Sequence, residues 1–291
     1  MALRVLTAED RRSPQNSKTS FLIVGPYGVG KTSLLRTLPG EKTLAIDIEG
    51  GLKSVDTWAG AGPSIPISSF PDFQDLVALI AGPDRAAAGN RFYSQNHYEH
   101  VRSLYAGTEI EEYAKLPVVF VDSITVLTRL AMKYAQQQPE AMSEKTGKPD
   151  TRGAYGLLAR EVINALQHLQ RAPGKVVIFV GLLEKVTDEF NRESWVPQME
   201  GSKAGRELPG IVDQVITMHT FARGEDAYVL DEKAVERRFV CQKANPFGLP
   251  AKDRSGRLSV TEAPDLGALL TKINSIENLS LIHISEPTRP Y

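Results

Sequence analysis

The segment GPYGVGKT at residues 25–32 constrains the fold of this chain more than any other feature of its sequence. It satisfies the pattern G-x-x-x-x-G-K-[ST], follows the apolar run FLIV and precedes the amphipathic stretch SLLRTL. The pattern is specific when a strand leads into the glycine-rich turn and a helix leaves it. The sequence therefore predicts a strand, a phosphate-binding turn and a helix in succession, a unit typical of a parallel sheet covered by helices.

Short β-branched apolar runs alternate with helical stretches along most of the chain, which predicts an α/β fold with a mainly parallel sheet between helices. The predicted strands are Phe21–Val24, Thr43–Ile48, Pro117–Val121 and Lys175–Val180. The predicted helices are Lys31–Leu38, Phe70–Ala81, Ile124–Gln138 and Gly156–Arg171. Shorter strands, which favour antiparallel pairing at the C-terminal edge of the sheet, follow at Val212–His219, Ala227–Leu230 and Glu236–Cys241. Two polar stretches are predicted to be long loops, Pro139–Gly153 and Glu184–Gly205.

Composition narrows the class of protein. Of the 291 residues, 42% are hydrophobic and 24% are charged, and the formal net charge is -1, so any contact with nucleic acid must come from local patches. The single cysteine, Cys241, excludes an internal disulfide framework and suits a reducing compartment. Because no apolar run approaches the roughly 20 residues that cross a bilayer, we expect a cytoplasmic protein with no membrane partner.

We expect three parts along the chain: a polar N-terminal extension at 1–18, one α/β domain at 19–275, and a non-native or unstructured tail at 276–291. The last residues, LSLIHISEPTRPY at 279–291, resemble the translation of a sequencing-library adapter. A native polar tail is the alternative. The functional interpretation therefore excludes this segment.

The residue types of the loop are those that bind the phosphates of ATP. Its glycines let successive backbone N–H groups point at phosphate oxygens, and the next helix directs the positive end of its dipole at the same anion. Lys31 supplies a point charge for the β- and γ-phosphates, and the Thr32 hydroxyl is a ligand for Mg²⁺. The predicted nucleotide-binding residues are Gly25, Pro26, Tyr27, Gly28, Val29, Gly30, Lys31, Thr32 and Ser33.

Asp122 is the second predicted metal ligand. It follows the apolar run VVFV, and the carboxyl end of a parallel strand beside the phosphate site is where a carboxylate holds Mg²⁺ or its water. Asp122 and Thr32 are therefore predicted to share the metal. Asp122 and Ser123 are also good N-caps for a helix that begins at Ile124, and the two roles are compatible.

Two short motifs resemble the RecA family, IDIE at Ile46–Glu49 and VDS at Val121–Ser123. In that family a strand of the form I-D-x-E follows the phosphate loop and supplies the catalytic glutamate. The resemblance implies that Glu49 orients the attacking water and that Asp47 supports the site. A solvated acid before the Gly50–Gly51 turn is the alternative for Glu49.

The resemblance extends more loosely over residues 21–259, and it is closest to the compact RecA-like ATPases of bacteriophages and prophages, which include single-strand annealing recombinases. In RecA-like rings and filaments a late K-x-R pair reaches the ATP of the neighbouring subunit. Lys252 and Arg254 match that pair, which implies a homo-oligomer with ATP sites at its interfaces; a basic surface turn is the alternative. The stretch that ends in the γ-phosphate-sensing polar residue in RecA carries apolar residues here, and the resemblance implies that Glu184 or Lys185 takes that role.

The two predicted loops correspond to segments of RecA-like proteins that contact single-stranded DNA. An aromatic side chain among cations suits base stacking with neutralisation of the backbone, but acidic residues offset the cations of the second loop, and solvated loops are the alternative. The candidate DNA-binding residues are Lys145, Lys148, Arg152, Lys185, Arg192, Trp195 and Lys203. The more basic segment Lys233–Arg257 is predicted to follow a phosphate backbone or to form a subunit interface.

These features predict an ATP-hydrolysing protein that requires Mg²⁺ and acts on single-stranded DNA, with DNA-stimulated turnover, together with other proteins of phage recombination or replication. Two other classes stay open. One is a helicase loader or nucleotide switch that works through protein partners. The other is a P-loop kinase for a small molecule, which is disfavoured because the sequence has no arginine-rich lid segment.

Overall fold

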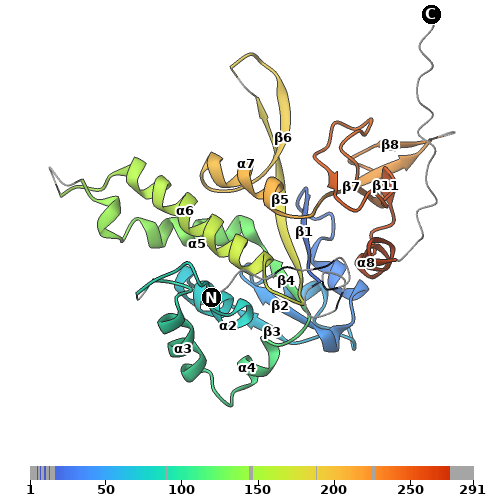
Figure 1. Cartoon of the computed structure of the whole chain (residues 1–291). Coiled ribbons are helices and arrows are strands. Elements are labelled where there is room, and N and C mark those ends of the chain that lie inside the picture. The colour runs from blue at the N-terminus through green and yellow to red at the C-terminus, as the bar shows by residue number, and fades with distance from the viewer. Residues whose placement is uncertain are drawn as a thin grey trace, which may run out of the picture.

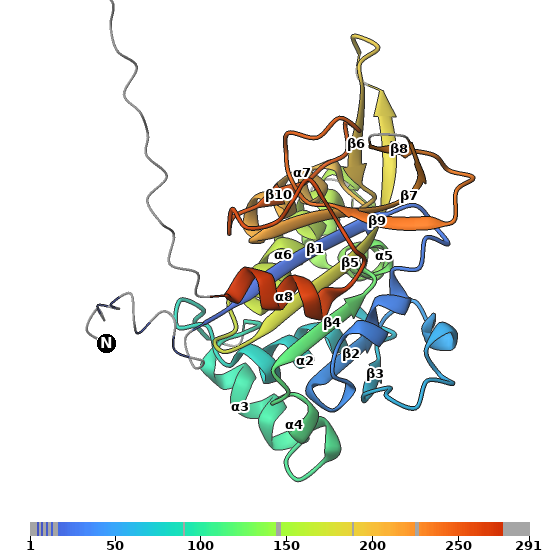
Figure 2. The same cartoon turned by 90° about the vertical axis from the view of Figure 1, so that its right-hand side faces the viewer.

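The computed structural model describes residues 5, 7, 10, 13, 17–89, 91–143, 147–187, 189–224 and 227–275. The predicted tail at 276–291, with its adapter-like end, lies outside the described residues, as does most of the predicted extension at 1–18. A mainly parallel sheet with antiparallel strands at one edge forms the centre of the molecule, and helices cover both of its faces (Figures 1 and 2). The predicted fold class is confirmed, while the division of the chain into three parts stays a prediction.

The strands follow one another across the sheet in the order β11-β9-β7-β1-β5-β4-β2-β3. The parallel strands are β1 (Thr19–Gly25), β2 (Thr43–Asp47), β3 (Ser64–Pro66), β4 (Val118–Asp122), β5 (Val176–Thr187) and β7 (Gln214–Arg223). The antiparallel strands are β6 (Glu193–Pro197), β8 (Tyr228–Leu230), β9 (Glu236–Val240), β10 (Lys252–Asp253) and β11 (Thr261–Glu262). β1 lies in the middle of the sheet, which explains why its apolar run carries no polar alternation.

Two hydrophobic clusters hold the helices to the two faces of the sheet. One cluster packs α2 (Phe70–Ala81), α5 (Ile124–Ala135) and α6 (Thr151–Gln170) against one face. The other packs the 3₁₀ helix η1 (Thr32–Thr37) and α8 (Leu266–Asn274) against the opposite face. The remaining helical segments are η2 (Gly40–Lys42), η3 (Leu52–Ser54), α3 (Gln95–Leu104), α4 (Glu109–Tyr113), η4 (Pro139–Ala141) and α7 (Ser202–Ile211).

Local capping explains where the large helices begin and end. The Ser69 hydroxyl accepts a hydrogen bond from the backbone N–H of Asp72, and Gly82, with φ of 76°, ends α2, so this helix has the predicted bounds. Asp150 caps α6 in the same way through the N–H of Arg152. This cap starts α6 five residues before the predicted Gly156.

The prediction of a long loop is wrong for residues 184–205, and for the described part of residues 139–153 it fails only at the two ends of the stretch. Residues 184–205 form most of a β-hairpin, because β5 continues beyond the sheet and pairs with β6, and α7 begins directly afterwards (Figure 2). Asn191, in the hairpin turn, adopts a φ of 57°, a left-handed conformation that asparagine tolerates better than most residues. Residues 139–153 include η4 and the first turn of α6.

The described part of the chain contains no helix that is long and apolar enough to span a membrane.

Candidate nucleotide site

The glycine-rich loop begins where β1 ends, and its backbone requires glycine at several positions. A Cβ atom on Gly25 would lie 2.3 Å from the carbonyl oxygen of Met218 in β7, so only glycine lets the loop start this close to the neighbouring strand. Gly28 and Gly30 have φ angles of 72° and 95°, which side chains other than glycine rarely adopt. The loop therefore has a curved backbone of the kind that turns amide groups toward an anion.

Lys31 is buried inside this loop. Its Nζ donates hydrogen bonds to the carbonyl oxygens of Gly25, at 3.0 Å, and Pro26, at 2.7 Å. Burial lowers the pKa of Lys31 to about 8, while the nearby carboxylates of Asp122 and Glu49 act in the opposite direction. The loop thus encloses one ammonium group that faces two carboxylates.

Thr32 and Asp122 meet directly beside that lysine. The Thr32 hydroxyl donates to Oδ2 of Asp122 at 2.5 Å. Burial raises the pKa of Asp122 to about 6, and the carboxylates of Glu49 and Asp47 add to this effect against the hydrogen bond from Thr32 and the charge of Lys31. The residues predicted to share a metal therefore lie in contact.

The alternative N-cap role is weak at this position. Ser123 is the N-cap residue of α5, but its side chain makes no capping hydrogen bond. Its buried hydroxyl oxygen has no hydrogen-bond partner in the described part of the protein. A buried hydroxyl without a partner is uncommon, and here it lies next to the carboxylate predicted to bind a metal.

Glu49 is held next to Asp122 by the backbone. The carbonyl oxygen of Asp122 accepts hydrogen bonds from the N–H groups of Ile48, at 2.7 Å, and Glu49, at 3.2 Å. Oδ1 of Asp47 accepts from the N–H of Gly50 at 2.8 Å, which shapes the turn after Glu49. Since the Glu49 side chain is exposed, it can contact a water molecule at the mouth of the site.

The oxygen atoms present suit magnesium. Mg²⁺ in nucleotide sites is bound through one or two carboxylates together with substrate phosphates, and here Thr32 and Asp122 supply a hydroxyl and a carboxylate. Within the described residues, no group of three or more His, Cys, Asp or Glu side chains could hold a metal ion. A metal at this site would therefore depend on phosphate oxygens of the nucleotide.

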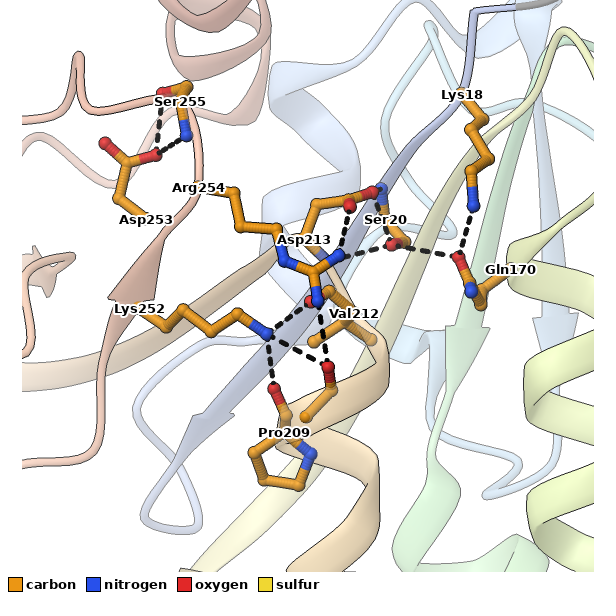
Figure 3. Close-up of polar contacts among 11 residues, drawn as sticks. Lys18, Ser20, Gln170, Pro209, Val212, Asp213, Lys252, Asp253, Arg254 and Ser255 are labelled. Atoms are coloured by element: carbon orange, nitrogen blue, oxygen red, sulfur yellow. Dashed lines mark hydrogen bonds and ion pairs between the residues drawn. The ribbon is translucent and has the colours of Figure 1, made fainter.

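Lys252 and Arg254 lie far from the loop of their own chain. Lys252 pairs in β10 with Val215, which is opposite Leu22 in the middle of β1. Arg254 pairs with Asp213, which contacts Ser20 at the start of β1, whereas the loop follows the end of β1. Figure 3 shows that Lys252 Nζ donates to the carbonyl oxygens of Pro209, Gly210 and Val212 at the C-terminal end of α7, and that Arg254 forms an ion pair with Asp213. Within this chain, both side chains therefore stabilise the end of α7.

Replacing Lys252 with alanine is expected to lower the free energy of unfolding by about 1–2 kcal/mol, because three carbonyl groups lose a charged donor. Lys243→Ala is the matched control, because Lys243 is an exposed lysine in the same segment, and we expect it to stay within about 0.5 kcal/mol of the wild type. Urea unfolding of the two variants gives the comparison. Equal effects would mean that the contacts of Lys252 contribute no stability.

The candidate DNA-binding residues are only partly brought together. Lys185 and Trp195 are cross-strand neighbours in the hairpin, with Nζ 5.9 Å from the indole ring, and Lys185 also pairs with Glu193. Arg192 lies over the ring of Phe190 near the turn. Figure 1 shows the start of α6, which carries Arg152 and follows Lys148, well apart from this hairpin. Lys203 lies on α7, and Lys145 lies outside the described residues.

Two threonines that sequence reasoning missed connect the site to the hairpin. The Thr125 hydroxyl accepts from the N–H of Leu182 at 2.9 Å and donates to the carbonyl oxygen of Gln198 at 3.0 Å, which joins both strands at the base of the hairpin. The Thr128 hydroxyl accepts from the N–H of Glu200 at 3.0 Å. Both threonines lie on α5, which begins two residues after Asp122. The sequence could have pointed to them, because they place two hydroxyl groups among the apolar positions of this helix.

A family model described as "AAA domain" matches residues 17–255, which include the loop, Asp122 and the hairpin. No curated protein matches the sequence.

The solved structures that resemble the chain include the following two. One is a prototypical ATPase from the type III secretion system of pathogenic bacteria, with 16% identity and a TM-score of 0.36, over 71% of this chain and 54% of that one. The other is the RadB recombinase, with 14% identity and a TM-score of 0.31, over 82% of this chain and 92% of that one. The chain thus spans about half the length of the first. Both TM-scores are too low to bear on function.

Proposed function

The chain belongs to the AAA domain family, and from this premise we propose that it binds Mg²⁺ and ATP at residues 25–33 and hydrolyses ATP by in-line attack of water. One observation carries the proposal: the Thr32 hydroxyl and the Asp122 carboxylate are in contact beside a buried lysine. A hydroxyl, a carboxylate and an ammonium at the end of a glycine-rich loop form the set that phosphoryl transfer requires.

Each residue of this set has a separate task in the proposed reaction. Lys31 exchanges its two carbonyl partners for oxygens of the β- and γ-phosphates, and so neutralises their charge. Thr32 and Asp122 would hold Mg²⁺, which supplies further neutralisation of the phosphates. Glu49 accepts a hydrogen bond from the attacking water and orients it toward the γ-phosphate. Its exposed carboxylate suits this task because Glu49 and Asp122 lie on the same side of the glycine-rich loop.

We further propose that neighbouring copies of the chain share ATP sites in a ring or filament. Lys252 contacts the end of α7, and Arg254 contacts Asp213 beside the start of β1, away from the loop that follows β1 in their own chain. This position supports a role at the site of a neighbour. A cation supplied by another subunit stabilises charge on the transferring phosphoryl group, and its contribution reaches roughly 10³-fold in rate. In that assembly the two side chains would exchange their contacts with the end of α7 for the nucleotide.

The proposed target is single-stranded DNA, with the protein acting in the cytoplasm in phage recombination or replication beside other proteins of those processes. The hairpin supports this proposal because it carries Lys185 beside Trp195, and Phe190 near its turn is 68% exposed. Aromatic rings stack on bases, and cations neutralise the backbone. Thr125 connects the proposed metal ligand Asp122 to the hairpin, because α5 begins next to Asp122 and the Thr125 hydroxyl bonds to both strands at the base of the hairpin.

ATP turnover measured with and without single-stranded DNA, across a salt series, tests this function. We expect DNA to stimulate turnover, with an effect that falls steeply with salt because backbone contacts release counterions. The double variant Lys185→Ala/Trp195→Ala should bind DNA at least about fivefold more weakly, since each stacked base contributes about 1–3 kcal/mol. Lys115→Ala is the matched control, because Lys115 is another surface lysine paired with a glutamate, and it should bind DNA like the wild type.

Other outcomes of this assay reject the DNA proposal. Stimulation by a replication protein in place of DNA would identify a helicase loader or nucleotide switch. Transfer of the γ-phosphate to an added small acceptor would identify a kinase.

A further inference from the structure

Arg237 lies against the glycine-rich loop, although it follows Val29 by 208 positions in the sequence. Its Nη1 atom is 3.5 Å from the carbonyl oxygen of Val29. A Cβ atom placed on Gly30 would lie 2.3 Å from the same Nη1. The guanidinium group therefore covers the loop one residue before Lys31, and a side chain at Gly30 would displace it.

The alternation of β9 explains why Arg237 points toward the loop. Successive side chains of a strand face opposite sides of the sheet. Phe239, two residues after Arg237, belongs to the hydrophobic cluster that also contains Val29. Arg237 thus shares the sheet face of the loop. Arg238 faces the other side, where its guanidinium lies 4.4 Å from the ring centroid of Tyr228.

The two sides of the loop carry opposite charge. In the sheet, β5, β4 and β2 lie on one side of β1, and β7 and β9 lie on the other. Asp122 and Glu49 therefore flank the loop on the first side and Arg237 on the second. The metal and the attacked γ-phosphate belong with the carboxylates. Because the β-phosphate occupies the loop itself, the α-phosphate and the nucleoside extend toward the second side.

Building on the proposed ATP function, we propose that Arg237 binds the α-phosphate of the nucleotide within its own subunit. Its guanidinium donates hydrogen bonds to the α-phosphate oxygens, a fork geometry that suits phosphate. ATP and ADP share this phosphate, so the contact stabilises the two complexes equally. An interaction of equal strength in the ground state and the transition state lowers KM without changing kcat. Arg237 would therefore set nucleotide affinity, whereas Glu49 sets turnover.

Titration of the wild-type protein and of Arg237→Ala with ATP and with ADP tests this role. We expect the Kd for both nucleotides to rise by about 10- to 30-fold, as for the loss of a charge-assisted hydrogen bond, with kcat at saturating ATP unchanged within about threefold. Arg237→Lys keeps the charge without the fork and should give an intermediate Kd. Arg238→Ala is the matched control, on the same strand but the opposite face, and its Kd values should equal those of the wild type.

Four results would overturn the proposal. Unchanged Kd values for Arg237→Ala would mean that the guanidinium does not touch the nucleotide. A rise for ATP alone, with a fall in kcat, would place Arg237 at the γ-phosphate. Equal losses in Arg238→Ala, with a lower Tm in both variants, would mean that the strand has only a structural role. If the wild-type protein itself binds neither nucleotide, the proposed ATP function fails, and the inference fails with it.

Discussion

Replacing Glu49 with glutamine is expected to reduce the rate of ATP hydrolysis by about 10²- to 10⁴-fold while leaving ATP binding intact. A positioned carboxylate that activates water contributes this much to a hydrolytic rate. The side chain is exposed and its backbone N–H, rather than its carboxylate, contacts Asp122. Because glutamine removes a negative charge close to Lys31, the affinity for the triphosphate should stay equal or increase slightly.

Single-turnover hydrolysis and equilibrium binding of ATP, measured on the same preparation, separate these two effects. Glu41→Gln is a suitable control, since Glu41 is an exposed glutamate in η2, directly before β2. This variant should hydrolyse ATP at the wild-type rate. Hydrolysis by Glu49→Gln within threefold of the wild type would remove Glu49 from the mechanism. The resemblance of residues 46–49 to the RecA motif would then have no catalytic meaning.

Replacing Asp122 with asparagine is expected to reduce Mg²⁺-dependent hydrolysis by about 10³-fold or more. The metal contributes several kcal/mol of charge stabilisation, and asparagine supplies a neutral oxygen in place of the carboxylate. The contact with Thr32 can persist, since the amide oxygen still accepts a hydrogen bond. Titration of activity with Mg²⁺ checks this prediction, and an unchanged Mg²⁺ requirement would exclude Asp122 as a metal ligand.

The same substitution should stabilise the nucleotide-free protein at neutral pH, by on the order of 1–3 kcal/mol. Burial raises the pKa of Asp122 to about 6 from the usual value of 3.8. The folded chain therefore binds a proton here more tightly than the unfolded chain does. The protonated carboxyl group therefore contributes to the free energy of unfolding. This contribution is fully present below about pH 4 and is lost as the pH rises through about 6.

Asparagine does not ionise, so the free energy of unfolding of the variant does not fall at this position as the pH rises. Urea unfolding should show equal stabilities near pH 4 and a more stable variant near pH 7. A variant that is less stable than the wild type at pH 7 would show that the charged form of Asp122 stabilises the fold.

The parallel half of the fold could be predicted because each of its elements has a local signal. The run before Gly25 has both faces buried and no polar alternation, and α2 begins at a serine cap and ends at a glycine. The hairpin of β5 and β6 lacked such a signal. Its strands project from the sheet and carry consecutive polar residues, Glu184–Lys185 and Glu193–Ser194, in place of an alternating pattern. Polar composition alone does not separate a solvated hairpin from a loop.

The proposed site could likewise be predicted from the sequence only in part. Lys31, Thr32, Asp122 and Glu49 could be predicted to lie together because their motifs are contiguous and follow β1, β4 and β2, parallel strands of one sheet. Arg237 was not predicted beside the loop because its position depends on the register in which β9 pairs with β7, which no local pattern specifies. Sequence reasoning assigned it only to a basic segment. The capping of α7 by Lys252 was hidden in the same way, because its partners lie about 40 residues earlier.

Equilibrium titration with a non-hydrolysable ATP analogue and Mg²⁺, on the wild-type protein and on Lys31→Ala, tests most directly whether residues 25–33 bind the nucleotide. The wild type is expected to bind one analogue per chain, and the variant should bind it about 100-fold more weakly, since the phosphates lose their buried cation. Equal affinity of the two proteins, or no binding by the wild type, would contradict the assignment.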